Sequence, residues 1–113
     1  MCGRKTLTKG KIEIIEELFV DEWEDDFDWE PSYNIAPTQI SPILLNDGKR
    51  KVKPMSWGLV PSWAKDKTIS AKMINARSET LGEKPSFQSL IYQKRCIVIS
   101  DGYFEWKREG SKK

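Results

Sequence analysis

A cysteine at position 2 is the residue of this sequence with the clearest chemical potential. The side chain of Cys2 is small, so removal of Met1 is expected to leave a free α-amine beside a thiol. Such a 1,2-aminothiol condenses with an aldehyde to an imine, and attack of the thiolate on the imine carbon then closes a five-membered thiazolidine. Both nucleophiles are partly in their reactive forms near neutral pH. The alternative is an incidental cysteine at a frayed terminus.

Three polar residues further along the chain are candidates to assist this chemistry. Glu105 follows an apolar aromatic run, where burial would favour a protonated carboxyl that donates and then takes back a proton. Asn75 and Arg77 are two residues apart and face one side of an extended segment. Arg77 suits a phosphate, and Asn75 suits a sugar hydroxyl or a backbone group. The alternatives are an exposed carboxylate, a turn-forming Asn and a solvated Arg.

Aromatic side chains set among lysines and glycines are candidates to stack on unpaired bases, with core packing as the alternative. They are Trp57, Trp63 and Trp106. The chain has no histidine, and its two cysteines match no zinc spacing, so no metal, no cofactor and no histidine-based triad is expected within it.

The charge of the chain is unevenly distributed. Residues 21–30 hold seven acidic residues and no basic one, which leaves 10 acidic against 19 basic residues, about +9, on the other 103. Such a balance suits a polyanion such as DNA, although lysines also keep small domains soluble. The length of 113 residues predicts a single domain over 1–113.

The sequence holds no feature that predicts export or a membrane span. It has no run of 18 apolar residues, the residues after Met1 are not apolar, and two cysteines do not make a disulfide framework. We therefore expect a reduced, cytoplasmic location with free thiols, associated with the nucleoid if the source is bacterial.

Hydrophobic spacing and turn residues predict the elements that must position these side chains. The prediction comprises a helix over 8–20 with Thr8 as N-cap, an irregular loop over 31–37, a β-hairpin of strands 39–45 and 51–60 around Asn46-Asp47-Gly48, a short helix over 86–93, and a buried strand over 95–106. Residues 106–113 look like a strand that enters a Gly-Ser turn without a returning partner.

Several motifs together resemble one family. They are Met1-Cys2-Gly3-Arg4, Tyr33-Asn34-Ile35-Ala36-Pro37, the segment Trp57 to Trp63, Asn75-Ala76-Arg77-Ser78-Glu79-Thr80, and Arg95-Cys96-Ile97-Val98 followed by Gly102-Tyr103-Phe104-Glu105-Trp106. In this order, and over the whole chain, they resemble the SOS-response-associated peptidase (SRAP) family. The resemblance implies an α+β fold, mostly antiparallel β and barrel-like, with a few helices.

The resemblance also implies an activity: a covalent crosslink to abasic sites in single-stranded DNA through a thiazolidine on Cys2, with self-removal of Met1 and a possible lyase step. It implies that Asn75 positions the cysteine, Arg77 binds phosphate and Glu105 gives acid-base help. DNA contacts are expected from Arg4, Asn34, Trp57, Trp63 and Trp106.

One departure from the family pattern concerns length. Family members run to about twice this length and carry a histidine in the second half, whereas this chain has none. We therefore expect the chain to correspond to the N-terminal half of such a protein.

Two other functions remain open at the level of sequence. One is an N-terminal-nucleophile peptidase that uses Cys2 and Glu105 on itself or on other proteins. The other is a non-catalytic single-stranded DNA-binding module in which Cys2 merely packs. The basic character outside 21–30 favours a nucleic acid over an extended peptide.

Overall fold

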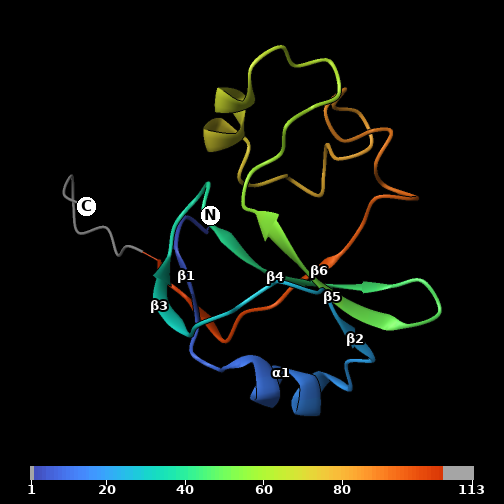
Figure 1. Cartoon of the computed structure of the whole chain (residues 1–113). Coiled ribbons are helices and arrows are strands. Elements are labelled where there is room, and N and C mark those ends of the chain that lie inside the picture. Colours follow the sequence, from blue (N-terminus) through green and yellow to red (C-terminus); the bar gives the residue numbers. More distant parts are fainter. Residues whose placement is uncertain (1, 106–113) are drawn as a thin grey trace.

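Two open β-sheets and one α-helix make up the fold in the computed structural model, which describes residues 2–105 (Figure 1). The elements in chain order are β1 (Lys5–Leu7), α1 (Lys11–Leu18), β2 (Glu22–Trp23), β3 (Ser32–Ile35), β4 (Ile40–Asn46), β5 (Arg50–Ser56), the 3₁₀ helix η1 (Lys67–Lys72), β6 (Ile97–Val98) and β7 (Gly102–Tyr103).

The two sheets have different strand orders. One is β3-β1-β7, with both neighbours antiparallel to the central β1, and the other is β2-β5-β4-β6, in which only the β2–β5 pair is parallel. The predicted α+β class with mostly antiparallel strands is therefore confirmed. Within residues 2–105 the sheets remain open and do not close into a barrel.

The central hairpin forms where the Asp-Gly step predicts it. Strands β4 and β5 pair from Ile40 opposite Ser56 to Asn46 opposite Arg50. Gly48 has φ of +100°, a conformation that favours glycine in tight turns. The second strand ends at Ser56, four residues earlier than predicted, because the chain turns away at Gly58, which has φ of +129°.

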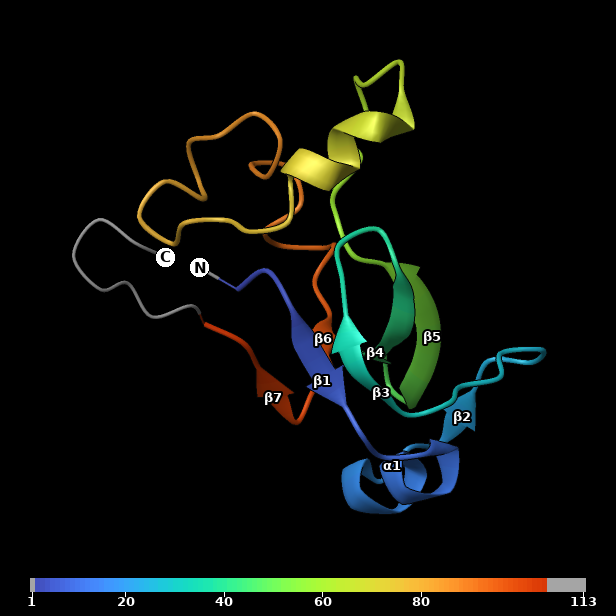
Figure 2. The ribbon, with the colours of Figure 1, turned by 90° about the vertical axis from the view of Figure 1, so that its left-hand side faces the viewer.

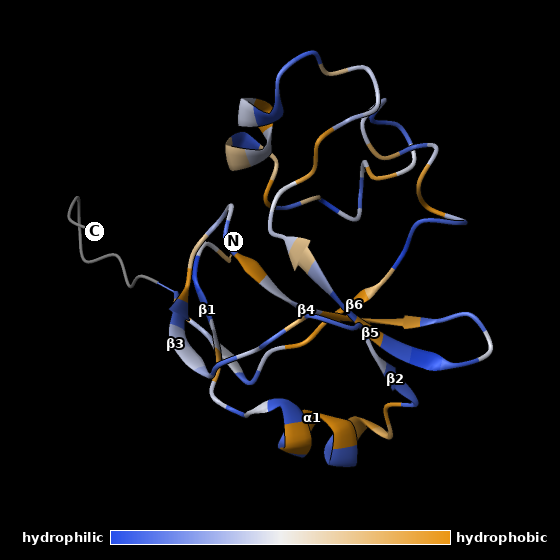
Figure 3. Ribbon diagram, in the orientation of Figure 1, coloured by the Kyte–Doolittle hydropathy of each residue, from blue (hydrophilic) through white to orange (hydrophobic). Residues whose placement is uncertain are grey.

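The first helix is shorter than predicted. It covers Lys11–Leu18 and begins after Gly10, whose N–H donates to the Glu13 carboxylate at 3.4 Å, so the prediction of Thr8 as N-cap is wrong. Figure 3 shows hydrophilic and hydrophobic stretches alternating along α1, as expected for a helix with one face on the core. No helix within residues 2–105 is long and apolar enough to cross a membrane.

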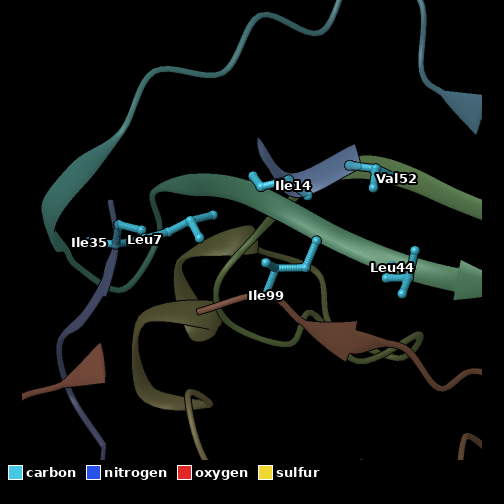
Figure 4. Packing of buried hydrophobic residues seen from close by; sticks show 6 residues of the cluster. All are labelled: Leu7, Ile14, Ile35, Leu44, Val52 and Ile99. Carbon is cyan, nitrogen blue, oxygen red and sulfur yellow. The ribbon is translucent and has the colours of Figure 1, made fainter. Parts of the chain in front are cut away.

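The core lies between the two sheets and α1. Strands from both sheets and the helix contribute buried aliphatic side chains that share one cluster (Figure 4). The cluster consists of Leu7, Ile14, Ile35, Leu44, Val52 and Ile99. Since its members come from segments between residues 7 and 99, this core joins the N-terminal strand to the last part of the described chain.

Two further predictions of local structure are wrong. The segment 31–37 is not an irregular loop, because the four residues Ser32–Ile35, between the two prolines, form β3 and pair with β1. Residues 86–93 form successive turns instead of a helix: hydrogen bonds to the residue three positions back (Phe87 to Lys84, Leu90 to Phe87) are mixed with an isolated bond to the residue four positions back (Gln88 to Lys84).

The predicted buried strand over 95–106 is divided into two pieces. Strand β6 pairs with β4 in one sheet, and β7 pairs with β1 in the other, so the chain changes sheets between them. Ile99, at the crossing, is buried, whereas Ile97 and Tyr103 are 62% and 68% exposed. A segment that serves two sheets cannot remain one continuous strand.

The acidic segment covers the outer edge of β5. Strand β2 runs parallel to β5, and Glu22 and Glu24 form ion pairs with Lys49 and Lys53 at 3.1 and 3.8 Å. The Asp21 carboxylate accepts a hydrogen bond from the Arg50 amide at 2.8 Å. Basic residues of β5 and of the turn before it thus neutralise part of the negative charge of residues 21–30.

Candidate functional site

A cleft of about 700 Å³ opens beside the N-terminal segment. Its lining residues come from the N-terminal segment and β1, from the open end of the β4–β5 hairpin, and from the chain between residues 57 and 103. Figures 1 and 2 show the long excursion that carries η1 leaving the sheets at this end of the hairpin. The polar and titratable residues on its walls are Cys2, Lys5, Ser41, Ser56, Asn75, Lys94, Arg95, Cys96, Ser100 and Tyr103. Most of the remaining lining is aliphatic or aromatic, so the cleft offers polar groups in an apolar setting.

Cys2 stands on the wall of this cleft and is half-buried. The side-chain amide of Asn75 donates to the Cys2 carbonyl at 2.7 Å, and the thiol contacts the Arg4 carbonyl at 3.5 Å. Strand β1 begins three residues later, at the centre of its sheet. The segment that carries Cys2 is thus held at both ends, by β1 and by Asn75.

Asn75 reaches Cys2 because the segment before it is fastened to residues 57–59. The Trp57 indole donates to the Ile74 carbonyl at 2.9 Å, and the Leu59 amide donates to the Met73 carbonyl at 2.9 Å. Gly58, between them, lies so close to Ser70 that a Cβ would collide with the Ser70 carbonyl. The Trp57-Gly58-Leu59 sequence therefore packs as a support for Asn75, and Trp57 also lines the cleft.

Lys5 is the second charged group of interest in the cleft. It is 4% exposed, and its ammonium donates to the Ser41 hydroxyl at 3.0 Å and to the Ile99 carbonyl at 3.1 Å. Burial lowers the pKa of Lys5 below its ordinary value, and the charge on Cys2 acts in the opposite direction. The buried ammonium is thus held by two neutral oxygen acceptors from other parts of the chain.

The other predicted assisting residues, Arg77 and Glu105, are not among the residues that line the cleft, although the Phe104 amide, just before Glu105, donates to the Arg4 carbonyl at 3.0 Å. Arg77 is exposed and stands outside the described cleft lining, although Asn75 and Ala76 line it. Glu105 is exposed as well, so the expectation that it is buried among aromatic groups is wrong: the preceding Phe104 and Tyr103 are themselves 42% and 68% exposed. Trp106 lies outside the described residues.

The remaining predicted DNA contacts are on the surface around the N-terminal segment and η1. The Arg4 guanidinium donates to the Asn34 side-chain carbonyl at 3.2 Å, and both residues are exposed. Trp63 is 59% exposed and lines a second hollow, of about 500 Å³, together with Lys65, Thr68 and Lys72. These two places thus offer cations and the exposed aromatic face of Trp63.

Reasoning from sequence missed three residues of this region. Lys5 and Ser41 are buried polar partners, and Asp101 accepts hydrogen bonds from the hydroxyls of Thr6 and Thr8 at 2.6 and 2.7 Å. The alternation of Lys5 with Leu7 on one face of a strand was a signal that Lys5 points inward. No local signal indicated Ser41 or Asp101, whose partners lie 36 and 93 or more residues away.

Within residues 2–105 there is no group of three or more histidine, cysteine or acidic side chains that could hold a metal ion. The polar groups that the structure brings to the cleft include the Cys2 thiol, the Asn75 amide and the buried Lys5 ammonium.

Comparison with known proteins identifies the family of this chain. Residues 1–113 match the family model described as SOS response associated peptidase (SRAP). The chain belongs to the SRAP family. This confirms the resemblance drawn from the motifs, and the family's sequence pattern covers the whole chain.

Several relatives of this SRAP chain are named abasic site processing proteins. YoqW of Bacillus subtilis is 48% identical over 109 residues, which are 96% of this chain and 49% of the relative. YoaM of the same organism is 45% identical over 113 residues, 99% of this chain and 50% of the relative. HMCES of Xenopus tropicalis is 38% identical, with 100% of this chain and 41% of the relative covered.

A solved structure has the same fold. The crystal structure of a protein from Bacteroides thetaiotaomicron superimposes with a TM-score of 0.80 and 29% identity, over 97% of this chain and 50% of that one. The chain thus spans about half the length of the curated relatives and of the structure that it matches.

Proposed function

We propose that this SRAP chain captures the aldehyde of an abasic site in single-stranded DNA through Cys2, after removal of Met1. The observation that carries the proposal is the placement of Cys2 on the wall of a cleft, with its carbonyl bound by Asn75 at 2.7 Å. The names of the relatives support abasic sites as the target, because an opened abasic sugar is an aldehyde.

The reaction uses both groups of the mature Cys2. Hydrolysis of the Met1–Cys2 bond consumes one water and frees the α-amine. The amine attacks the C1′ aldehyde carbon of the opened deoxyribose, and the carbinolamine loses one water to give an imine. The thiolate then attacks the imine carbon while the nitrogen takes a proton, which closes the thiazolidine. Only an aminothiol forms this ring.

The surrounding residues have distinct parts in the proposal. Asn75 holds the backbone of Cys2 at the cleft, so that amine and thiol approach the same carbon. Glu105 exchanges protons with the sugar oxygen during ring opening and with the amine during imine formation. Arg77, exposed beside the segment that carries Asn75, contacts a phosphate.

The DNA strand is expected to cross the surface beside the cleft. Arg4, Asn34 and Trp63 are exposed, and Trp63 can stack on an unpaired base. Trp57 is half-buried and bonded to the Ile74 carbonyl, so a base could contact only the part of its side chain that lines the cleft.

The test is the intact mass of the protein after incubation with single-stranded DNA that contains one abasic site. We expect loss of Met1 and an adduct that survives denaturation, with one water lost relative to the summed masses. Cys2→Ala and Cys2→Ser should abolish it, and so should acetylation of the α-amine, because the imine cannot then form. A Cys2→Ala protein that forms the adduct as fully as the parent would refute the proposal.

The family description favours one other function, a peptidase. The same Cys2 would then act on a peptide bond, either its own Met1–Cys2 bond alone or bonds in other proteins. Competition separates the two functions: abasic single-stranded DNA blocks peptide cleavage if both use one cleft, and a peptidase without affinity for DNA cleaves at an unchanged rate.

A further inference from the structure

A tight turn between β3 and β4 has a backbone conformation that its sequence does not favour. The Gln39 amide donates to the Ala36 carbonyl at 3.2 Å, so Pro37 and Thr38 occupy the two central positions of the turn. Thr38 has φ of +73°, a value that suits glycine or asparagine at this place and strains a β-branched residue. Contacts with the rest of the structure must therefore hold the turn in place.

Hydrogen bonds fasten this turn to Trp57. The Thr38 amide donates to the Trp57 carbonyl at 2.8 Å, and the Trp57 amide donates to the Gln39 carbonyl at 3.0 Å. The Ser56 hydroxyl donates to the Thr38 carbonyl at 3.1 Å. Within the turn, the Gln39 side chain accepts a hydrogen bond from the Ala36 amide at 2.9 Å. The Ala36–Gln39 turn thus holds both backbone polar groups of Trp57.

The side chain of Trp57 connects this support to the candidate nucleophile. Its indole N–H donates to the Ile74 carbonyl at 2.9 Å, and the next residue, Asn75, donates its side-chain amide to the Cys2 carbonyl at 2.7 Å. The carbonyl that the indole holds belongs to the peptide group between Ile74 and Asn75. A shift of this peptide group therefore displaces the Asn75 amide from Cys2.

The same turn is joined to Cys2 from the other side as well. It follows β3, in which Ile35 pairs with Lys5 of β1, and β1 continues the segment that carries Cys2. The contacts thus form a closed ring, which runs from Cys2 through β1, β3 and the turn to Trp57, and returns through Asn75. Because the ring is closed, the position of each arm at Cys2 depends on the other.

We propose that Trp57, held by the Ala36–Gln39 turn, is a positioning residue for Cys2, and that the reaction with an abasic aldehyde needs its indole N–H more than its aromatic face. The inference rests on the proposed function for the reaction that it concerns. Trp57 lines the cleft, so the alternative is a ring that stacks on a base. Stacking requires the ring alone, whereas positioning requires the donor to Ile74.

The test is Trp57→Phe, which keeps an aromatic ring at the cleft and removes the donor to Ile74. The rate of adduct formation in the full chain is measured against the concentration of abasic single-stranded DNA. We expect the maximal rate to fall roughly two- to twelvefold, the scale of one neutral hydrogen bond, with the half-saturating concentration within about twofold of the parent. An unchanged maximal rate, or a raised half-saturating concentration alone, would overturn the inference.

The matched control is Trp29→Phe. The Trp29 indole also donates to a backbone carbonyl, that of Lys9, at 3.1 Å, but Trp29 is not among the residues that line the cleft. The control loses the same kind of hydrogen bond and should keep the parent maximal rate. Urea unfolding of both variants shows whether each remains folded under the conditions of the assay.

A double variant tests whether Trp57 acts through Asn75. Trp57→Phe combined with Asn75→Ala should react at the rate of Asn75→Ala alone, because the amide that the indole places is then absent. Losses that multiply in the double variant would contradict this route.

The part of the turn is tested at Gln39. Gln39→Ala removes the acceptor of the Ala36 amide and should lower the maximal rate roughly two- to fivefold, whereas Gln39→Glu keeps an acceptor oxygen and should restore the rate. This pair also decides the inference if Trp57→Phe does not fold. A parent rate in Gln39→Ala, or an equal loss in Gln39→Glu, would count against the turn.

A measurement without DNA separates the inference from the proposed function. The NMR signals of the Asn75 side-chain amide should move toward those of a free amide in Trp57→Phe and stay unchanged in Trp29→Phe. If they do so and the parent forms no adduct with abasic DNA, the positioning of Asn75 by Trp57 stands and the proposed function fails. If the parent forms the adduct and Trp57→Phe keeps both the signals and the maximal rate, the inference fails and the proposed function stands.

Discussion

Replacement of Asn75 tests whether its hydrogen bond positions the nucleophile. The bond from the Asn75 amide to the Cys2 carbonyl is short, at 2.7 Å, and partly buried, and it joins residues 73 positions apart. A neutral hydrogen bond of this kind contributes about 0.5–1.5 kcal/mol. If the reaction requires this placement, Asn75→Ala should slow adduct formation by roughly two- to twelvefold.

Asn75→Asp is a stronger form of the same perturbation. It sets a carboxylate oxygen against the Cys2 carbonyl oxygen, two acceptors that repel each other, so we expect a loss of at least about tenfold. The control is Asn46→Ala, at the exposed end of β4, which alters an asparagine far from the cleft.

The assay follows the fraction of abasic single-stranded DNA that is retarded on a denaturing gel as a function of time. The affinity is measured separately with an abasic analogue that has no aldehyde and cannot form the adduct. The loss should appear in the rate and leave affinity within about twofold of the parent, because the bond is made to protein backbone. An Asn75→Ala protein that reacts at the parent rate would show that β1 alone places Cys2.

Four further predictions concern separate parts of the molecule. Arg77→Ala should weaken binding to single-stranded DNA and lower the salt dependence by about 0.7 to 1 unit of slope; an unchanged slope would assign Arg77 to structure. Glu105→Gln in the full-length protein should bind DNA normally but react on the order of 10²-fold more slowly, and a parent rate across the pH profile would contradict its role. Gly58→Ala should destabilise the fold by at least about 2 kcal/mol in urea unfolding, since positive φ is strained for alanine and the Cβ meets the Ser70 carbonyl; equal stability would show that residues 70–75 can shift. The hydrogen bonds from Thr6 and Thr8 lower the pKa of Asp101, so the stability that they contribute is complete above the ordinary aspartate pKa and is lost as the pH falls through the lowered value. The melting temperature of Asp101→Asn should therefore lose this dependence on acid pH. The same pH dependence in the parent and the variant would contradict the prediction.

Local signals in the sequence were sufficient for the elements that depend on local interactions. The Asp47-Gly48 step predicts the β4–β5 turn because glycine adopts a positive φ without strain. The helical spacing of the apolar residues from Ile12 to Phe19 predicts α1, although the side chain that it buries is that of Ile14, while Ile12 and Phe19 are exposed. The failures lie where distant partners decide. Phe87 and Leu90 have helical spacing, yet they line the cleft from a series of turns.

The candidate site shows the same division. The chemistry of Cys2 follows from its position next to Met1, and the amide of Asn75 was predicted to be near it only through the family resemblance. The alternation of Lys5 with Leu7 indicates an inward side chain, but its partners Ser41 and Ile99 come from distant parts of the chain and carry no local signal. Glu105 was expected to be buried because it follows an apolar run, but the described structure leaves that run exposed.

The acidic segment on the outer edge of β5 separates negative from positive charge within the described part of the chain. Residues 11–30, which include α1 and β2, carry ten acidic side chains and one lysine, whereas residues 57–95, which surround the cleft, carry seven basic and three acidic ones. Figure 1 places α1 and β2 opposite η1. A polyanion therefore exerts a torque on the molecule before contact, which turns the acidic end away and brings the mouth of the cleft forward, so productive encounters become more frequent at low salt.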